Sequence, residues 1–471
     1  MTLRSEGGLG LRSREDADLA VRLARSLAVR SEGVQIRTED FPRWLAERRR
    51  THRFRVERIA FADLDQWTFE KSTGNLVHDS GKFFSVAGLR CATDEGPFRK
   101  WEQPIIRQPE IGVLGLLLKE FDGVLHVLMQ AKMEPGNPNV LQMSPTVQAT
   151  RSNYTRVHRG TKVKYLDHFI GPGRGRVLAD ALQSEHGAWF HHKVNRNMMV
   201  EAIGTVPVED DFCWLTLGQI GELLRADNMI NMDARTVLAC APIGTTEDGA
   251  LHTDTEVLSW LTAERVRREM RTELKPLAEV AGWVRGGRSI DHVEGRYFTV
   301  IAAAVTAGNR EVGQWTQPLI EPRGLGVTAF LTRRIGGVRH VLVHARAECG
   351  VRHGIELAPT VQCVPDNHRH LAGADRPPFL DLVLETGPER ILYSAIHSEE
   401  GGRFLNAESR YLIAEVDEGD VPSGPPPGFH WVSLGQLRHL VQHPHYLNVQ
   451  ARTLLACLNT GAVDDWRTHR T

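Results

Sequence analysis

The sequence predicts an α+β protein built from two tandem copies of one domain-sized module. The first observation is an internal repeat: residues 101–153 align with residues 315–367 at a constant offset of 214, and 20 of the 53 positions are identical. The second is a β-hairpin pattern at the same place in both copies. The third is a pair of helical segments that closes each copy. A period this long indicates a duplicated domain rather than a solenoid.

The duplication extends beyond this central block. Trp44 and Trp67 lie 23 residues apart, and so do Trp260 and Trp283. Residues 212–240 align with residues 429–457 at an offset of 217, which places a short insertion before Phe429. A module of about 200 residues can bury its own core. We therefore expect an N-terminal extension over 1–40, a first module over 41–241, a linker over 242–256, a second module over 257–458 and a C-terminal tail over 459–471.

The composition excludes several classes of protein. Lysine and arginine number 57 against 58 aspartates and glutamates, so we expect neither a nucleic-acid nor a membrane-surface partner. The longest apolar run, Ile111 to Leu118, is too short to span a membrane. The six cysteines form no CxxC pair and no disulfide framework, which favours a reducing cytoplasm.

Each module is expected to open with a charged helix. Residues 41–61 and 257–277 interleave arginines with acids, so we interpret them as solvated helices rather than nucleic-acid patches. Two strands follow, Val113–Phe121 and Val124–Lys132, joined by the Asp122-Gly123 turn. Gly336-Gly337 forms the same turn in the second copy.

The remaining elements of the module follow in order. A third strand is expected at Pro145–Thr150 and Pro359–Val364. Residues 176–190 and 390–404 read as either a helix or an extended segment before a glycine turn. A further strand is expected at Asn197–Ile203 and Tyr411–Val416, and two helices end each copy. Hairpins with flanking helices, without βαβ units, favour a mixed sheet in an α+β fold.

Alternation along the second strand places His126, Leu128, Gln130 and Lys132 on one face of the sheet. The second copy repeats this pattern with His340, Leu342, His344 and Arg346. This face is either the wall of a groove or a solvent-exposed surface, and the pattern leaves both open.

Familiar catalytic motifs are missing from the chain. The run FIGPGRGRVLADAL has an arginine, Arg176, where a dinucleotide fingerprint needs its third glycine, so we interpret it as a loop. There is no GxxxxGK[ST], no GxSxG and no HExxH sequence. The histidine clusters lack the spacing of zinc ligands.

Two long strings carry a family resemblance. QPEIGVLGLLLKEFDGVLHVLMQAKMEPGN with LQMSPTVQATRSNYTRVHRG resembles the first-repeat signature of the NDP-hexose 2,3-dehydratases. QPLIEPRGLGVTAFLTRRIGGVRHVLVHARAE with ELAPTVQC, SEEGGRF and NVQARTLLACL resembles the second-repeat signature. The resemblance covers residues from about 40 to 460. It departs from the family pattern at His344, at Arg346 and in the loop CGVRHG of the second module.

The resemblance implies a fold and a reaction. Members of this family act on dTDP-4-keto-6-deoxy-D-glucose and remove its C2 hydroxyl, which commits the sugar to the 2-deoxysugars of antibiotics and related natural products. The product would pass to a 3-ketoreductase. The resemblance also implies two Nudix-hydrolase-like modules, a homodimer, and no nicotinamide or metal cofactor. The REx(x)EE metal box of Nudix hydrolases is absent from both modules, which disfavours metal-dependent hydrolysis.

The implied chemistry needs a base, a proton donor and a cation or hydrogen bonds. The base removes the C3 proton, the charge moves to the C4 oxygen, and the C2 hydroxyl leaves with help from an acid. Polar positions shared by both copies, and a tyrosine near them, are the candidates. The catalytic candidates are Lys132, Glu134, Tyr154, Arg346, Glu348, Gln362, Glu399 and Glu400. The sequence does not decide which module carries the site.

Substrate-binding candidates combine cations for a diphosphate with aromatic rings for thymine. Core packing is the alternative role for the two tryptophans. These candidates are Trp67, Gln148, Arg151, Asn153, Arg156, Lys162, Lys164, Tyr165, Arg196, Trp283, Asn367 and Arg410. Two other functions stay open beside the lyase: a non-catalytic nucleotide-sugar binding protein and an unorthodox Nudix-like hydrolase.

Overall fold

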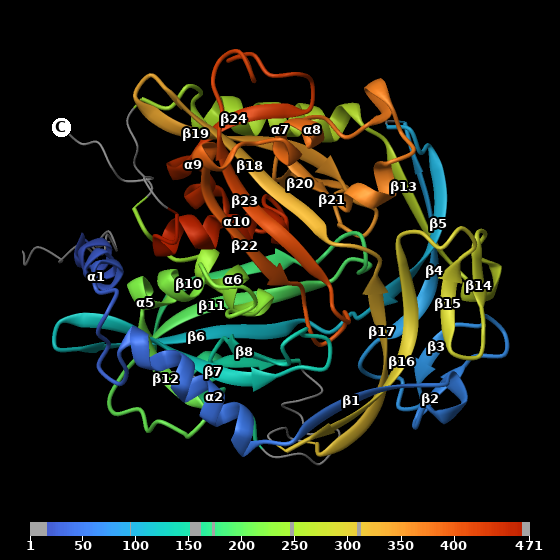
Figure 1. Ribbon diagram of the computed structural model, residues 1–471, viewed down its shortest axis with the longest axis horizontal. Coiled ribbons are helices and arrows are strands. Elements are labelled where there is room, and N and C mark those ends of the chain that lie inside the picture. The colour runs from blue at the N-terminus through green and yellow to red at the C-terminus, as the bar shows by residue number, and fades with distance from the viewer. Residues whose placement is uncertain are drawn as a thin grey trace, which may run out of the picture.

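Strands dominate the part of the chain that the computed structural model describes, namely residues 17–94, 96–150, 162–171, 175–244, 249–308 and 312–463. Within these ranges they form two seven-stranded and two five-stranded sheets. Figure 1 shows the two larger sheets on the left, one above the other, and the two smaller sheets on the right.

The larger sheets repeat one mixed topology. In the first, β11 runs parallel to β6 and every other pair is antiparallel. Its strands are β6 (Gly112–Phe121), β7 (Val124–Met133), β8 (Leu141–Ser144), β9 (Val147–Ala149), β10 (Gly175–Ser184), β11 (Val194–Ala202) and β12 (Phe212–Thr216). The matching strands of the second sheet are β18 (Gly326–Ile335), β19 (Val338–Ala347), β20 (Ile355–Ala358), β21 (Val361–Cys363), β22 (Ile391–Ser398), β23 (Glu408–Glu415) and β24 (Phe429–Ser433).

The two smaller sheets exchange a strand between the modules. In the first, β13 of the second module pairs with β4; in the other, β1 of the first module pairs with β16. The first holds β2 (Trp67–Phe69), β3 (Leu76–His78), β4 (Ser85–Thr93), β5 (Lys100–Arg107) and β13 (Met270–Lys275). The other holds β1 (Phe54–Ile59), β14 (Trp283–Arg285), β15 (Ser289–His292), β16 (Phe298–Ala307) and β17 (Gln314–Pro322). Each module therefore completes a sheet of its neighbour.

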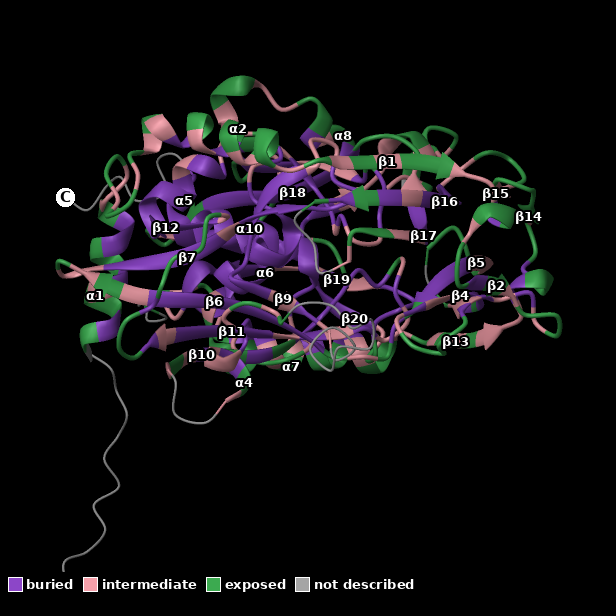
Figure 2. Ribbon diagram, turned by 90° about the horizontal axis from the view of Figure 1, so that it is seen from below, coloured by how far each residue is buried: buried purple, intermediate pink, exposed green. Residues whose placement is uncertain are grey.

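Helices flank the larger sheets. Those of the described residues are α1 (Ala17–Ala28), α2 (Phe41–Thr51), α4 (Asp167–Ile170), α5 (Leu217–Leu223), α6 (Met232–Ala239), α7 (Asp254–Arg267), α8 (Leu380–Leu384), α9 (Leu434–Leu440) and α10 (Val449–Thr460). None of them is long and apolar enough to cross a membrane. Buried residues concentrate in the larger sheets and in α6 and α10, whereas the smaller sheets carry more exposed positions (Figure 2).

Two buried arginines join the modules by reciprocal hydrogen bonds. Arg235 on α6 donates to the carbonyl of Ser398 at 2.6 Å, and Arg452 on α10 donates to the carbonyl of Ser184. Both side chains are fully buried. A buried cation is stabilised only where acceptors replace the water that it loses, so these arginines fix the two modules in register.

Two glycines allow the module backbones to meet. The Gly136 amide donates to the Gly401 carbonyl at 2.7 Å, and the Gly350 amide donates to the Gly187 carbonyl at 2.7 Å. A Cβ on Gly136 would lie 1.7 Å from the carbonyl oxygen of Phe404. Close packing of the two modules therefore requires glycine at this position of the repeat, which is Gly136 in the first copy and Gly350 in the second.

The structure confirms the hairpins and the closing helices but corrects the first helix of each module. That helix ends at Thr51 in the first module and at Arg267 in the second. The residues expected to form its second half instead form strand β1 in the first module and β13 in the second. The exchanged strand pairs with the other module, a long-range contact that overrides local helix propensity. Residues 176–190 and 390–404, left open between helix and strand, contain strands β10 and β22.

Candidate active site

A cavity of about 260 Å³ lies where the first large sheet meets the second module. Strands β6, β7, β9 and β11 and the start of α6 form its floor, and residues 312–317 and 400–403 of the second module close one side. Residues from β2, β3 and the turn before β4 form the remaining wall. Both modules therefore contribute to a single cavity.

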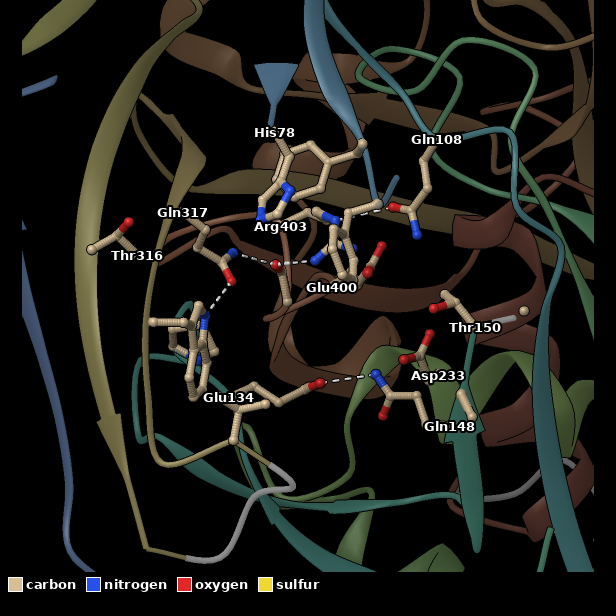
Figure 3. Close-up of a pocket in the computed structure, with 18 of the residues that line it drawn as sticks. His78, Gln108, Glu134, Gln148, Thr150, Asp233, Thr316, Gln317, Glu400 and Arg403 are labelled. Carbon is tan, nitrogen blue, oxygen red and sulfur yellow. Dashed lines mark hydrogen bonds between the residues drawn. The ribbon is translucent and has the colours of Figure 1, made fainter. Parts of the chain in front are cut away.

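Three carboxyl groups face this cavity from three different elements (Figure 3). Glu134 follows β7, Asp233 lies in the first turn of α6, and Glu400 follows β22 of the second module. Three cations line the same cavity: Lys132, Lys193 and Arg403. A buried site with this balance of charge suits acid–base chemistry on an anionic substrate.

Amide side chains hold Glu134 in place. Gln148 donates to its Oε1 at 2.8 Å, and Asn231 donates to its Oε2 at 3.3 Å. The Oδ1 of the same Asn231 caps α6 by accepting from the Ala234 amide at 2.9 Å. One side chain therefore orders both the helix that carries Asp233 and the neighbouring carboxylate.

The surroundings of Glu400 and Asp233 raise the pKa of both carboxyls above the usual value for an acid. Burial raises the pKa of Glu400 to about 7; Arg403 opposes this, while Glu185 and Glu134 add to it. Burial also raises the pKa of Asp233, and Glu400 reinforces the shift. A neighbouring carboxylate disfavours ionisation of a buried carboxyl, which adds to the effect of burial on both groups.

The cations are fixed by oxygen acceptors. Lys193 donates to the Oδ1 of Asn195 at 2.8 Å, and burial lowers the pKa of its ammonium group. Asn195 donates in turn to Oε1 of Glu185 at 2.6 Å. Arg403 donates to Gln108 at 3.0 Å and lies over the Phe84 ring, 4.2 Å from its centroid.

Aromatic rings line the wall that faces these charges. Trp315 donates to Gln317 at 2.8 Å, and Gln317 donates to the Gly402 carbonyl at 2.8 Å. Trp67, His78 and Phe84 belong to the same wall. Trp67 also donates to the Thr316 carbonyl at 2.9 Å and is buried, so it serves packing and the cavity together.

Five residues expected from the sequence line this cavity: Lys132, Glu134, Glu400, Trp67 and Gln148. Their second-module counterparts form a separate cluster. Arg346 donates to Glu348 at 3.2 Å, and Gln362 donates to Glu348 at 2.9 Å. Arg151, Asn153, Tyr154 and Arg156 lie outside the described residues.

Glu399 lies outside the cavity lining. It is buried, and its carboxylate accepts from His186 at 2.8 Å and from the hydroxyl of Tyr411 at 2.9 Å. Burial opposes ionisation, yet the charge and hydrogen bond of His186 hold the pKa of Glu399 below its usual value. Such a carboxylate is occupied by protein partners and is poorly placed to remove a substrate proton.

Several expected substrate-binding residues have other partners. Arg196 forms two hydrogen bonds with Asp180, at 2.8 and 2.6 Å, and Lys162 and Lys164 pair with Asp167 and Glu209. None of these three residues lines the cavity, and neither do the four expected residues named in the next sentence. Tyr165 bonds the Pro207 carbonyl, Trp283 the Glu102 carbonyl, Asn367 the Tyr297 amide and Arg410 the Ser394 hydroxyl.

The polar face of β7 also differs from the groove wall considered from the sequence. Lys132 lines the cavity, but His126 accepts from the Val34 amide at 3.1 Å and is buried. Leu128 packs in an apolar cluster with Trp214. Only the end of this face reaches the site.

Sequence reasoning missed Asp233, Lys193, Asn195 and Arg403 because it favoured residues shared by the two copies. The positions that match them are Gln450, Ala407, Ser409 and Trp189. The sequence feature that could have pointed to these four residues was therefore a difference between the two copies. Among the described residues, no group of three or more histidine, cysteine or acidic side chains is placed to hold a metal ion.

Comparison with known proteins places the chain in a family. Residues 38–241 and 254–458 match the family model described as NDP-hexose 2,3-dehydratase. The chain is 56% identical over 457 residues to a dTDP-4-dehydro-6-deoxy-alpha-D-glucopyranose 2,3-dehydratase of Amycolatopsis orientalis, a match that covers 96% of each chain. Enzymes of the same name from Saccharopolyspora spinosa and Streptomyces violaceoruber are 51% and 50% identical; each match covers 90% of this chain, and 92% and 97% of theirs.

Proposed function

The chain belongs to the NDP-hexose 2,3-dehydratase family, and from this premise we infer that it is a dTDP-4-keto-6-deoxy-D-glucose 2,3-dehydratase. It is a hydro-lyase that removes the C2 hydroxyl and yields a dTDP-3,4-diketo-2,6-dideoxyhexose. We assign this reaction to the cavity formed by Glu134, Asp233 and Glu400.

The observation that carries the assignment is the contrast between the two copies. Where the first-module cavity has Asp233, Lys193 and Arg403, the equivalent positions hold Gln450, Ala407 and Trp189. The position of Glu400 is taken by His186, which pairs with Glu399 and stacks on Trp189 with ring centroids 5.6 Å apart. The second copy has thus lost two of the three carboxyls and two of the three cations, and an indole occupies its arginine position.

Glu400 is the base in this proposal. Removal of the C3 proton at neutral pH is most effective when the pKa of the base lies near the working pH. Burial raises the pKa of Glu400 to about 7, which meets this condition. Its carboxyl is partly accessible, and it lines the cavity without a hydrogen bond to another described side chain. It is therefore free to approach the sugar.

Asp233 is the proton donor. Burial and the neighbouring Glu400 raise its pKa, which favours the protonated form that a proton donor needs. It is 3% exposed, so the proton is shielded from solvent. Donation to the C2 oxygen releases water, and the remaining enol then takes a proton at C2 and becomes the diketo sugar.

Lys132 stabilises the negative charge that develops on the C4 oxygen when C3 is deprotonated. It is 8% exposed at the end of β7, beside the amide-bound Glu134. A fixed cation in a site that excludes water stabilises such an oxyanion more strongly than water does. Arg403 is placed to bind the diphosphate, and Phe84 and Trp315 present flat surfaces for thymine.

The finer features of the assembly are also proposals. The repeated mixed sheet with flanking helices supports two Nudix-like modules with boundaries near 41–241 and 257–458. We further propose a cytoplasmic homodimer that serves antibiotic or related deoxysugar biosynthesis and delivers its labile product to a 3-ketoreductase. Sedimentation equilibrium tests the dimer, and a monomer at working concentration would exclude it.

Product analysis tests the reaction itself. Purified protein is incubated in D₂O with dTDP-4-keto-6-deoxy-D-glucose, and a ketoreductase with NADPH traps the product for mass spectrometry. We expect a trapped sugar nucleotide that lacks one oxygen and carries deuterium at C2. Unchanged sugar nucleotide with measurable binding would instead indicate a non-catalytic binding protein, and release of dTMP would indicate a hydrolase.

A further inference from the structure

The loop CGVRHG, residues 349–354, differs from its first-module counterpart PGNPNV, residues 135–140, and plays no part in the proposed reaction. It lines a second cavity of about 360 Å³, together with the end of α7, the start of β13 and the end of β4. The first-module cavity and this one have no lining residue in common. The loop therefore belongs to a distinct concave surface.

Basic side chains outnumber acidic ones in this second cavity. Arg265, Arg268, Arg352, His192 and His353 line it, and Glu269 is the acid among its lining residues. Two of these charges are already paired, because Glu264 binds Arg268 at 2.9 Å and Glu269 binds Arg271 at 3.0 Å.

Two arginines of this cavity have no acidic ion-pair partner among the described residues. Among the described residues, neither Arg265 nor Arg352 forms an ion pair with an acid. Arg265 donates to the carbonyls of Ile355 and His445, which fixes its guanidinium beside the loop. The guanidinium of Arg265 is thus held by neutral carbonyls, and the nearby carboxylate of Glu356 offsets part of its charge without forming an ion pair with it.

The pKa values of His192 and His353 are shifted by burial and by the neighbouring positive charges. The pKa of His192 is lowered by burial and by the charges of Arg352 and His353. The pKa of His353 is lowered by burial and by His445, Arg265 and Arg352, against a smaller opposing effect of Glu356. Burial is the larger cause of both shifts, and the neighbouring arginines add to it because a nearby cation disfavours a second positive charge.

The first module lacks this loop chemistry. Pro138 and Asn139 occupy the positions of Arg352 and His353. Asp211, which pairs with His52 at 2.9 Å, is replaced in the second module by Gly428. The second copy has thus gained an arginine and a histidine and lost an acid at matched positions.

We propose that the cavity beside residues 349–354 binds a diphosphate group. Arginine forks bind phosphate oxygens in pairs, and imidazoles donate to the same oxygens once an anion favours their protonation. Free diphosphate and the terminal phosphates of a nucleotide share this chemistry.

Calorimetric titration tests the proposal on the full chain. The first cavity is filled beforehand with dTDP-glucose, which lacks the C4 ketone and therefore does not react. Inorganic pyrophosphate is then titrated, with dTDP in a parallel arm to distinguish the two sources. We expect pyrophosphate to bind the filled enzyme, and Arg352→Ser with His353→Gln to weaken that binding at least about 10-fold.

The controls separate this site from the catalytic cavity. Arg49→Ala removes the first-module counterpart of Arg265 and should leave pyrophosphate affinity within about twofold. Arg352 is exposed, so its substitution should preserve folding and dehydratase turnover. Loss of pyrophosphate binding on filling with dTDP-glucose, or equal affinity in the Arg352 variant, would overturn the proposal even if dehydration is confirmed.

Discussion

Glu400 of the second module and Asp233 of the first face each other across one cavity (Figure 3). Neither residue has an acidic counterpart in the other copy, where His186 and Gln450 stand. The duplication therefore did not produce two equivalent cavities. It brought one carboxyl from each copy to a single place.

The first prediction concerns Glu400. If Glu400 is the base, its pKa of about 7 means that turnover of the wild type should fall as the pH drops below 7, where the carboxylate takes up a proton. Glu400→Gln should lower kcat at least about 10²-fold and remove this acid limb from the residual activity. The pH dependence of kcat measures both effects, and a retained acid limb would assign the base elsewhere.

Asp233 should govern the opposite limb of the pH profile. If Asp233 is the proton donor, its raised pKa extends to higher pH the range over which the acid keeps its proton, and activity should fall once the pH exceeds that pKa. Asp233→Asn should reduce kcat about 10²–10⁴-fold and flatten the alkaline limb. Gln450→Asn at the matched position is the control and should leave kcat within about threefold.

A matched pair of variants tests which module is catalytic. Glu134 and Glu348 are equivalent, and each accepts a hydrogen bond from its own glutamine, at 2.8 and 2.9 Å. Glu134→Gln should lower kcat/KM at least about 10²-fold, whereas Glu348→Gln should change it less than about threefold. The reverse order would move the reaction to the second module.

Arg403 should affect binding more than chemistry. If it holds the diphosphate, Arg403→Lys should raise KM by about 10-fold while kcat falls much less, because a diphosphate is bound equally in ground and transition states. Arg196→Ala should leave KM unchanged, since Arg196 is committed to Asp180. Steady-state kinetics of the two variants would contradict this account if the KM values changed in the opposite order.

The last prediction concerns stability. Gly136→Ala would push a methyl group into the Phe404 carbonyl and should destabilise the fold by about 3 kcal/mol. Gly123 lies in the β6–β7 turn at φ 76°, where a Cβ would meet no other atom within 4 Å, and Gly123→Asn is the control that should cost far less. Denaturant titration measures both, and equal losses would argue against tight module packing at Gly136.

The sequence predicted the repeated fold well because local signals specify it. The β6–β7 turn, Asp122-Gly123, and its Gly336-Gly337 counterpart are visible in any short window, as is the period of the closing helices. The strand exchange was not visible, since β1 and β13 are specified by partners in the other module. Long-range pairing leaves little trace in a local pattern.

The site was predicted only in part for a related reason. Shared residues such as Glu134 and Gln148 do line the proposed site, but sharing also marks structural residues such as Arg235 and Arg452. Chemistry performed by one copy leaves the other free to change. Asp233 stands in MDART where the second copy has VQART, and that mismatch was the informative signal.

The most direct test of the central claim is a crystal structure of the Glu400→Gln variant with dTDP-4-keto-6-deoxy-D-glucose bound. We predict that the sugar lies between residue 400 and Asp233, with C3 facing residue 400 and the C2 oxygen within about 3.2 Å of the Asp233 carboxyl. A sugar ring bound beside Glu348, or one whose C2–C3 bond faces away from both residues, would contradict the assignment of the active site.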